Sequence, residues 1–162
     1  MSSLKRYHTV PDAMAFAQFA YFGLEDKAGL DYLAHPVRVM ETVKRRGGVP
    51  YLQIAALLHD VIEDTVITGQ MILDLGFHED AVEVIQLLTR SKHTGPCDVM
   101  TRSLCSGCLV YYAEIREHPG ACLVKLADID DNSDPARLQY LPPAKQERLV
   151  VKYTYGRELL TA

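Results

Sequence analysis

Apolar residues along this chain recur at every third or fourth position, which is the spacing of helices that bury one face. Thr9, followed three residues later by Asp12, is typical of a capping box at the start of a helix. Pro36 is well placed to open a second helix that ends at Gly47 and Gly48. Further helices are predicted from Pro50 to Leu58, from about Asp80 to Leu88, near Val110, from Ala121 to Ile129, and after Pro142 and Pro143.

The stretch from Ile54 to Leu58 is apolar on every side, as expected of a helix that passes through the middle of a core. Residues 91–106 carry mixed polar, glycine and proline signals, which predict a loop. No segment alternates strictly between apolar and polar residues, and no internal repeat is present. We therefore predict an all-α fold that forms a single domain over residues 1–162.

The composition is that of a soluble globular protein, with 48% hydrophobic and 23% charged residues. A formal net charge of −4 provides no positive field for a polyanionic duplex, so nucleic acid is not an expected partner. The longest apolar run is far shorter than the roughly 20 residues that cross a bilayer, and polar residues follow Met1. We expect a cytoplasmic protein with no membrane partner, and the sequence leaves homo-oligomer formation open.

Two ionisable residues, His59 and Asp60, stand directly after the apolar helix. A carboxylate in a core is costly unless a partner or a metal compensates its charge. Glu63 and Asp64 lie four residues further on, so on a continuing helix they share the face of the first pair. The alternative is a histidine satisfied within the core, followed by a solvated acidic turn.

Two more residues of ligand type favour the metal. His35 lies beside the helix-opening Pro36, and Asp128 stands near the end of another apolar stretch. Imidazole and carboxylate ligands together suit Mn²⁺, Fe²⁺, Co²⁺ or Zn²⁺ better than Mg²⁺ or Ca²⁺. Four such ligands leave positions open for water and substrate, so we predict one bound divalent metal ion.

These residues occur in a characteristic order: His35-Pro36, then the run Leu57 to Thr65 (LLHDVIEDT), then Val124 to Asp128 (VKLAD) with Asn132 downstream. This ordered set resembles the HD superfamily, and most closely the hydrolase domain of the Rel/Spo alarmone enzymes and their small stand-alone relatives. The resemblance covers roughly residues 13–155. It implies an HD-type helical bundle that uses Mn²⁺ to remove the 3′-pyrophosphate of (p)ppGpp.

The resemblance also implies roles for individual side chains. Four positions match the metal ligands of the family: His35, His59, Asp60 and Asp128. Two match the acidic pair that helps to position and deprotonate the attacking water: Glu63 and Asp64. Four match substrate contacts or lie where related hydrolases grip phosphates: Lys27, Asn132, Arg137 and Arg148. For the two arginines, and for Lys152 nearby, a solvated face is the alternative.

One position departs from the alarmone hydrolases. Before the first histidine they carry Gly-Gln-x-Arg-Lys-x-Gly-x-x-Tyr, in which the arginine helps to hold the guanine base. This chain keeps Lys27 and Tyr32 but has Asp26 at the arginine position. Because an aspartate cannot donate the planar fork of a guanidinium, we expect weakened recognition of guanine. Tyr32 and Tyr153 either stack on a base or pack in the core.

A second group of ligand-type residues lies in the predicted loop. Cys105 and Cys108 form a Cys-x-x-Cys pair, with Cys97 and His93 nearby. These residue types fit a structural zinc site, although the spacing matches no known module. Unpaired loop thiols and a redox pair are the alternatives.

We therefore expect a divalent-metal phosphohydrolase that acts on a small phosphorylated nucleotide, with a (p)ppGpp-like 3′-pyrophosphate as the first candidate. No glycine-rich phosphate loop is present, so only hydrolysis is expected. The alternative is a non-catalytic nucleotide sensor that keeps the HD scaffold. The Glu63–Asp64 pair argues against the sensor, because binding alone needs no general base.

Overall fold

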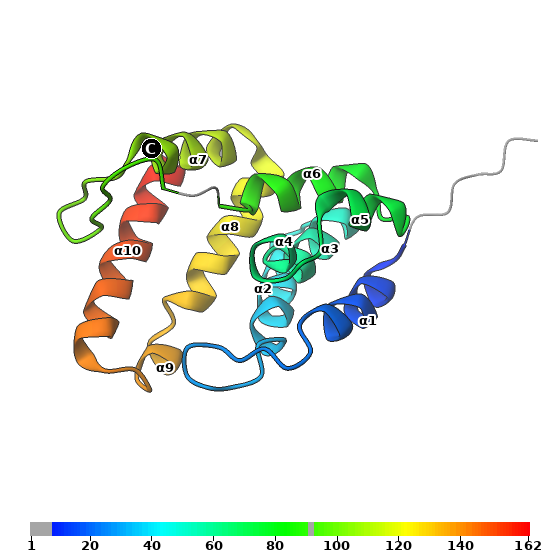
Figure 1. Cartoon of the computed structure of the whole chain (residues 1–162), viewed down its shortest axis with the longest axis horizontal. Helices are drawn as coiled ribbons and strands as arrows, with labels where there is room; N and C mark the ends of the chain where they lie inside the picture. Colours follow the sequence, from blue (N-terminus) through cyan, green and yellow to red (C-terminus); the bar gives the residue numbers. More distant parts are fainter. Residues whose placement is uncertain (1–7, 91–92) are drawn as a thin grey trace, which may run out of the picture.

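The computed structural model describes residues 8–90 and 93–162, which form helices joined by loops (Figure 1). No strand is present in these two ranges, and two isolated bridges, Glu25 with Asp31 and Asp98 with Ser103, close short loops. The all-α prediction is confirmed. The helices are α1 (Val10–Ala20), α2 (Ala34–Arg45), α3 (Pro50–Leu58), α4 (Val61–Asp64), α5 (Gly69–Asp74), α6 (Glu79–Leu88), α7 (Ser106–Glu117), α8 (Pro119–Asn132), α9 (Pro135–Leu138) and α10 (Pro143–Thr161).

Several helix ends lie at or near the positions that local sequence signals predict. The capping box of α1 forms as predicted, because the Thr9 side chain accepts from the Asp12 amide and the Asp12 carboxylate accepts from the Thr9 amide. Helix α2 begins at Ala34, two residues before Pro36. The amides of a first helical turn have no intrahelical acceptor, so a proline is tolerated anywhere within that turn.

The largest departure from the predicted helices lies at the end of α3. The helix ends at Leu58 and a turn follows, in which Asp60 has φ −100° and ψ −1°. The acidic pair therefore lies on a separate four-residue helix, α4, and not on a continuation of α3. The amide of Asp64 still donates to the carbonyl of Asp60 at 2.9 Å, which keeps the two residues one turn apart. The short helices α5 and α9 were not predicted, because neither is long enough to show a helical period.

The core forms around α3, which packs against α1, α2 and α6. Leu57 and Leu58 are completely buried, and each such side chain contributes on the order of 2 kcal/mol of hydrophobic stabilisation. Helix α8 runs beside α2 and also packs against α7 and α10 (Figure 1). The polar residues that follow α3 and lie on α8 are thus carried by rigid, well-packed helices. Within the described residues, no helix has the length and apolar character needed to cross a membrane.

Candidate metal centre and active site

Three segments bring His35, His59 and Asp128 together. His35 lies in the first turn of α2, His59 in the turn after α3, and Asp128 on α8. One ligand atom from each lies within 4.8 Å of the other two. Oδ1 of Asp128 is 3.2 Å from Nε2 of His35 and 3.5 Å from Nε2 of His59. All three side chains are buried, so the polar atoms face one another in a space sheltered from water.

Asp60, the fourth predicted ligand, faces the same space. Its Oδ2 lies 3.1 Å from Nε2 of His59 and 3.8 Å from Nε2 of His35. The hydroxyl of Tyr32 donates a hydrogen bond to this oxygen. The structure thus brings all four predicted ligands together. Tyr32 has a third role, a hydrogen bond to a candidate ligand, besides the base stacking and core packing that were predicted for it.

The hydrogen bonds of the two histidines leave their Nε2 atoms facing the carboxylates. Nδ1 of His59 lies 2.7 Å from the carbonyl of Ala56, which can only accept, so Nδ1 carries the proton. Nε2 of His59 is buried, and among the described residues it has no hydrogen-bond partner. A buried polar atom without a partner is costly. A divalent cation between this nitrogen and the carboxylates removes that cost, so the donor set fits a metal.

The electrostatics of the centre also favour a positive charge. Burial opposes the charged form of His59, yet the nearby carboxylates of Asp60 and Asp128 raise its pKa well above the usual value. Burial likewise opposes the charge of Asp128, but the Lys125 ammonium and the two histidines hold its pKa well below the usual value. The centre therefore keeps its carboxylates ionised and draws positive charge towards them.

Two neighbours on α8 hold the Asp128 carboxylate in place. Lys125 donates to Oδ2 at 2.7 Å, and Asn132 donates to Oδ1 at 2.6 Å. Asn132, predicted to contact substrate, thus contacts the candidate ligand. Lys125 was not predicted as a functional residue. Its signal in the sequence is a lysine within an apolar stretch, three residues before Asp128 and so on the same helical face.

Asp131 supports the other side of the centre and was also missed by the sequence analysis. Its Oδ2 lies 2.6 Å from Nδ1 of His35, and its Oδ1 accepts from Nε of Arg38 at 2.6 Å. Arg137 donates to the same carboxylate. Burial opposes the charge, but these contacts lower the pKa of Asp131 to about 2. A carboxylate on Nδ1 fixes the orientation of the ring, as carboxylates do behind many metal-bound histidines.

The acidic pair lies at the edge of the same cavity. Oε2 of Glu63 accepts from the amide of Arg90 at 3.1 Å. Asp64 is exposed at the cavity edge, and its pKa is raised by partial desolvation of the carboxyl group and by the nearby charge of Asp60. A carboxylate with a raised pKa accepts a proton more readily near neutral pH.

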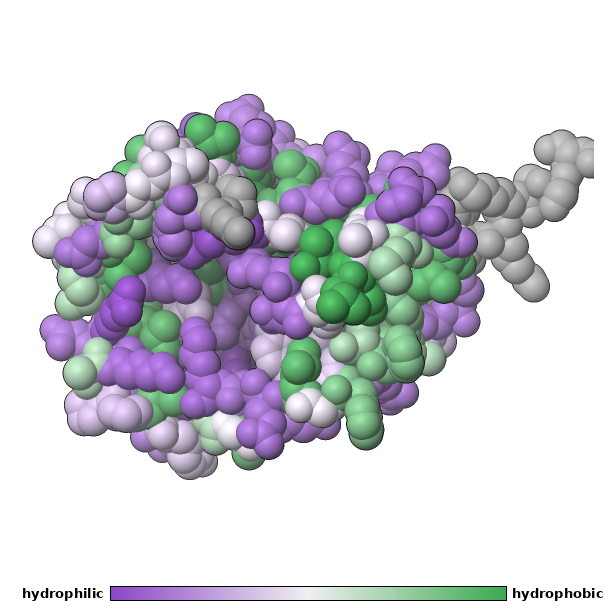
Figure 2. Space-filling view, in the orientation of Figure 1, coloured by the Kyte–Doolittle hydropathy of each residue, from purple (hydrophilic) through white to green (hydrophobic). Residues whose placement is uncertain are grey.

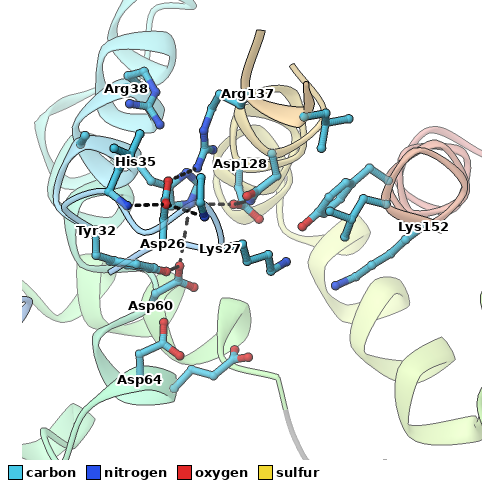
Figure 3. A pocket seen from close by; sticks show the side chains of 18 of the residues that line it. Asp26, Lys27, Tyr32, His35, Arg38, Asp60, Asp64, Asp128, Arg137 and Lys152 are labelled. Atoms are coloured by element: carbon cyan, nitrogen blue, oxygen red, sulfur yellow. Dashed lines mark hydrogen bonds and ion pairs between the residues drawn. The ribbon is translucent and has the colours of Figure 1, made fainter. Parts of the chain in front are cut away.

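The cavity in front of this centre has a volume of about 570 Å³, within the usual range for small-molecule sites. Figure 2 shows a recess with hydrophilic side chains around it on this face of the molecule. Its walls differ in charge. Histidines and carboxylates line one side, and Figure 3 shows Lys152 across from Asp60 and Asp64, with Lys27 extending towards it from beside Asp26. Arg90 and Lys125 also line the cavity.

The cations on this wall influence one another. Burial, together with the charges of Arg90, Lys27 and Lys125, lowers the pKa of Lys152 to about 8. An anionic ligand would relieve this mutual repulsion. One cavity therefore joins the cluster of histidines and carboxylates to a group of cationic side chains.

The remaining predicted substrate residues are placed differently from one another. Arg137 lines the cavity, but it is paired with Asp131 and with Asp26. Arg148 does not line this cavity and instead lines an adjoining hollow, which it shares with Lys152. Tyr153 is buried and lines the main cavity, so it is available to both of the roles predicted for it.

Known proteins resemble this chain in both sequence and fold. It is 32% identical, over 139 residues that make up 85% of its length, to a probable guanosine-3′,5′-bis(diphosphate) 3′-pyrophosphohydrolase of Synechocystis sp.. The resemblance to the Rel/Spo-type hydrolases is confirmed. The chain spans only 18% of the length of that relative. No protein-family model matches it.

A solved structure, described as a metazoan ortholog of SpoT that hydrolyses ppGpp, superimposes with a TM-score of 0.69. The two are 21% identical, and the match covers 98% of this chain and 85% of the other. At that identity the likeness concerns the fold alone. The predicted HD-type helical bundle is therefore confirmed as the fold of this Rel/Spo-like chain.

Proposed function

We propose that this Rel/Spo-like chain is a divalent-metal-dependent phosphohydrolase whose substrate is a phosphorylated nucleotide, with the 3′-pyrophosphate of (p)ppGpp as the first candidate. The observation that carries the proposal is the buried Nε2 atom of His59, which has no hydrogen-bond partner among the described residues and faces two carboxylates. The similarity to a pyrophosphohydrolase supports the same conclusion.

The metal ligands in this proposal are His35, His59, Asp60 and Asp128, and the metal is Mn²⁺, with Fe²⁺, Co²⁺ and Zn²⁺ as competitors for the same donor set. A bound divalent ion lowers the pKa of water and neutralises charge on phosphoryl oxygens. Asp131 orients His35 and Lys125 orients Asp128, so both ligands are held before any ion arrives.

Other side chains of the cavity bind the phosphates and activate the attacking water. Lys152, across the cavity from the carboxylates, and Lys27, which extends towards it, bind the phosphates. Asp64, with its raised pKa, accepts the proton of the attacking water, and Glu63 positions that water.

Recognition of the base is the part of the proposal that differs most from the alarmone hydrolases. Asp26 contributes to the structure of its loop, because its Oδ1 accepts from the amides of Ala28 and Leu30 at 2.8 and 3.0 Å. Its other oxygen pairs with Arg137, which brings a guanidinium to the cavity from a different segment. We propose that this site selects its ligand mainly through the phosphates and only weakly through the base.

The test is a hydrolysis assay of the purified chain with ppGpp and a panel of nucleotides, with and without added Mn²⁺. Glu63→Gln and Asp64→Asn are expected to keep the metal and to lower kcat by roughly 10²- to 10⁴-fold. Glu83→Gln, an exposed carboxylate change on α6 outside the cavity lining, is the matched control. If the parent chain hydrolyses none of the panel and both acidic-pair variants bind nucleotide with unchanged affinity, the protein is a non-catalytic nucleotide sensor and the proposal of an enzyme is wrong.

A further inference from the structure

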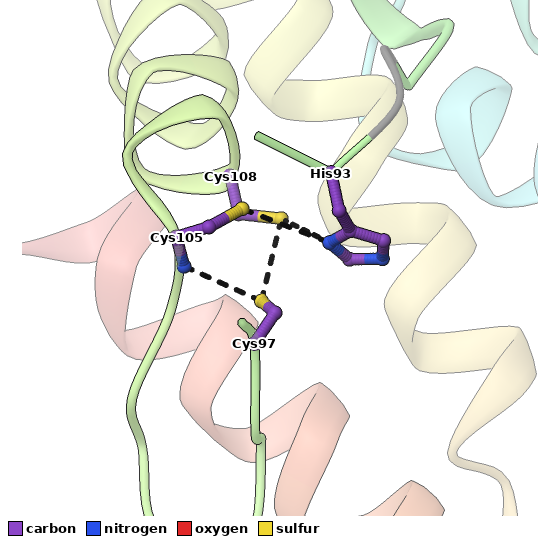
Figure 4. A group of neighbouring side chains, drawn as sticks. All are labelled: His93, Cys97, Cys105 and Cys108. Carbon is purple, nitrogen blue, oxygen red and sulfur yellow. Dashed lines mark hydrogen bonds between the residues drawn. The ribbon is translucent and has the colours of Figure 1, made fainter. Parts of the chain in front are cut away.

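Four side chains of metal-ligand type converge at a place outside the phosphohydrolase cavity. His93 and Cys97 come from the loop after α6, and Cys105 and Cys108 lie at the start of α7 (Figure 4). One ligand atom from each lies within 4.8 Å of the other three. Seven residues lie between Cys97 and Cys105 in the sequence, so folding of the loop is what brings the group together.

The distances between these atoms match the edges of a tetrahedral zinc site. Zinc bonds of about 2.3 Å to sulfur and about 2.0 Å to nitrogen give edges of roughly 3.8 Å between sulfurs and roughly 3.5 Å between sulfur and nitrogen. Sγ of Cys97 lies 3.7 Å from Sγ of Cys108. Nδ1 of His93 lies 3.7 Å from Sγ of Cys105 and 3.3 Å from Sγ of Cys108. A disulfide needs about 2.05 Å, so these cysteines are thiols, not a disulfide pair.

The surrounding backbone is arranged to support thiolates. The amide of Cys105 donates to Sγ of Cys97 at 3.4 Å. Cys105 is the N-cap residue of the twelve-residue helix α7 and Cys108 lies in its first turn, where the positive end of the helix dipole favours negative charge. The amide thus favours the thiolate of Cys97 and the dipole that of Cys105, whereas burial and the neighbouring thiols raise the pKa of the Cys108 thiol.

The loop is also fitted closely to the start of α7. The amide of Gly107 donates to Oγ1 of Thr94 at 2.9 Å. A Cβ atom at Gly107 would lie 2.8 Å from Cγ2 of Thr94, so a larger residue would push the loop away. Gly107, which precedes Cys108, thus permits the close approach of the loop to α7 that the cluster requires.

We propose that His93, Cys97, Cys105 and Cys108 bind one structural Zn²⁺ ion. Three thiolates and one imidazole are soft donors that select zinc over Mn²⁺, which prefers oxygen. Four protein ligands complete the tetrahedral shell and leave no position for water, which is the arrangement of a structural site. Binding requires deprotonated thiols, so it releases protons and weakens at acidic pH.

The zinc site shapes the surface next to the phosphohydrolase cavity. Residues 93–105 contain no helix, and the Asp98–Ser103 bridge closes the middle of this loop. His93, Cys97 and Cys108 line the adjoining hollow of about 330 Å³, together with Arg148 and Lys152. By fixing the loop, zinc holds one wall of this basic hollow in place. The zinc assignment itself does not depend on the proposed function.

The test replaces the metal of the purified full chain with Co²⁺ and records its absorption spectrum. Thiolate-to-cobalt charge transfer in the near ultraviolet, with the intense visible bands of tetrahedral cobalt, is expected from this cluster. The His/Asp centre contains no cysteine, so it cannot produce the charge-transfer band. The double variant Cys97→Ser, Cys108→Ser is expected to lose the band. Cys122→Ser, which removes the remaining cysteine of the chain from α8, is the matched control and is expected to keep it.

Two measurements that leave the four proposed zinc ligands unchanged keep the proposal falsifiable if the double variant does not fold. Elemental analysis after expression in zinc-containing medium is expected to find zinc that stays bound when the His/Asp centre is disrupted by Asp60→Ala. Alkylation mapped by mass spectrometry is expected to spare Cys97, Cys105 and Cys108 until a chelator removes the metal, with Cys122 unaffected by the chelator. Iron in place of zinc, a Cys97–Cys108 disulfide, or equal alkylation with and without metal would each overturn the assignment.

Discussion

Arg137 donates from Nη2 to Oδ2 of Asp26 at 3.1 Å, which joins the loop before α2 to the end of α9 across 111 residues of sequence. Both side chains are mostly shielded from water, with 11% and 25% of the side-chain surface of Asp26 and Arg137 exposed. The aspartate that replaces an arginine of the alarmone hydrolases is thus paired with an arginine from elsewhere in the chain.

A double-mutant cycle measures this pair. Asp26→Asn keeps an oxygen for the amides of Ala28 and Leu30 but loses the charge, and Arg137→Gln removes the guanidinium. We expect a coupling free energy of about 1–2 kcal/mol, because the pair is charge-assisted and partly buried. Urea denaturation of the parent, both single variants and the double variant gives this value. A coupling indistinguishable from zero would show that the contact does not contribute to stability.

Base selectivity should be weak. The loss of an arginine contact to guanine removes about 1.5–3 kcal/mol of binding, which corresponds to roughly ten- to a hundredfold in affinity. We expect kcat/KM for ppGpp and for its adenine counterpart to differ by less than about tenfold. The measurement is a direct comparison of the two substrates under identical metal conditions. A strong preference for guanine would mean that another group in the cavity, with Arg137 the nearest guanidinium to Asp26, reads the base.

Asp131→Asn should weaken metal binding without removing a ligand. The substitution takes a negative charge away from Nδ1 of His35, so the ring is held less firmly and its Nε2 is a poorer donor. Changes of this kind typically cost 10- to 100-fold in metal affinity. Calorimetric titration with Mn²⁺ checks the value. The adjacent Asp130→Asn is the matched control, because Asp130 pairs with Arg46 and Arg157, and an equal loss in both variants would refute the orienting role.

Lys152 should make activity fall at alkaline pH. Its pKa is lowered to about 8 by burial and by neighbouring cations, so the free chain loses this ammonium as the pH rises through about 8. Because kcat/KM reports ionisations of the free enzyme, we expect it to decrease above that pH. Lys152→Arg stays charged and should lose this alkaline limb, whereas Lys152→Met should be slow at every pH. A limb at the same pH in the arginine variant would assign the ionisation to another group.

Local signals in the sequence were sufficient for much of this protein. Helical periodicity, the capping box at Thr9 and the apolar run before His59 depend on neighbouring residues, so they determined the all-α class and most of the longer helices. The ordered histidine and aspartate motifs pointed to residues that the structure brings within a few ångströms of one another. Short helices such as α4 and α5 could not be predicted in this way, because a helix of fewer than two turns shows no period of apolar residues.

Only the tertiary structure decided which side chains support and surround those motifs. The contact of Asp131 with His35 spans 96 residues, and the pairing of Asp26 with Arg137 spans 111. The cationic wall likewise draws Lys27, Arg90 and Lys152 from different segments. Such contacts form when packed helices bring distant side chains into one cavity, and no pattern of neighbouring residues encodes that arrangement. The motifs therefore predicted the candidate metal ligands, whereas the packing of α2, α8 and α10 determined which charged side chains surround them.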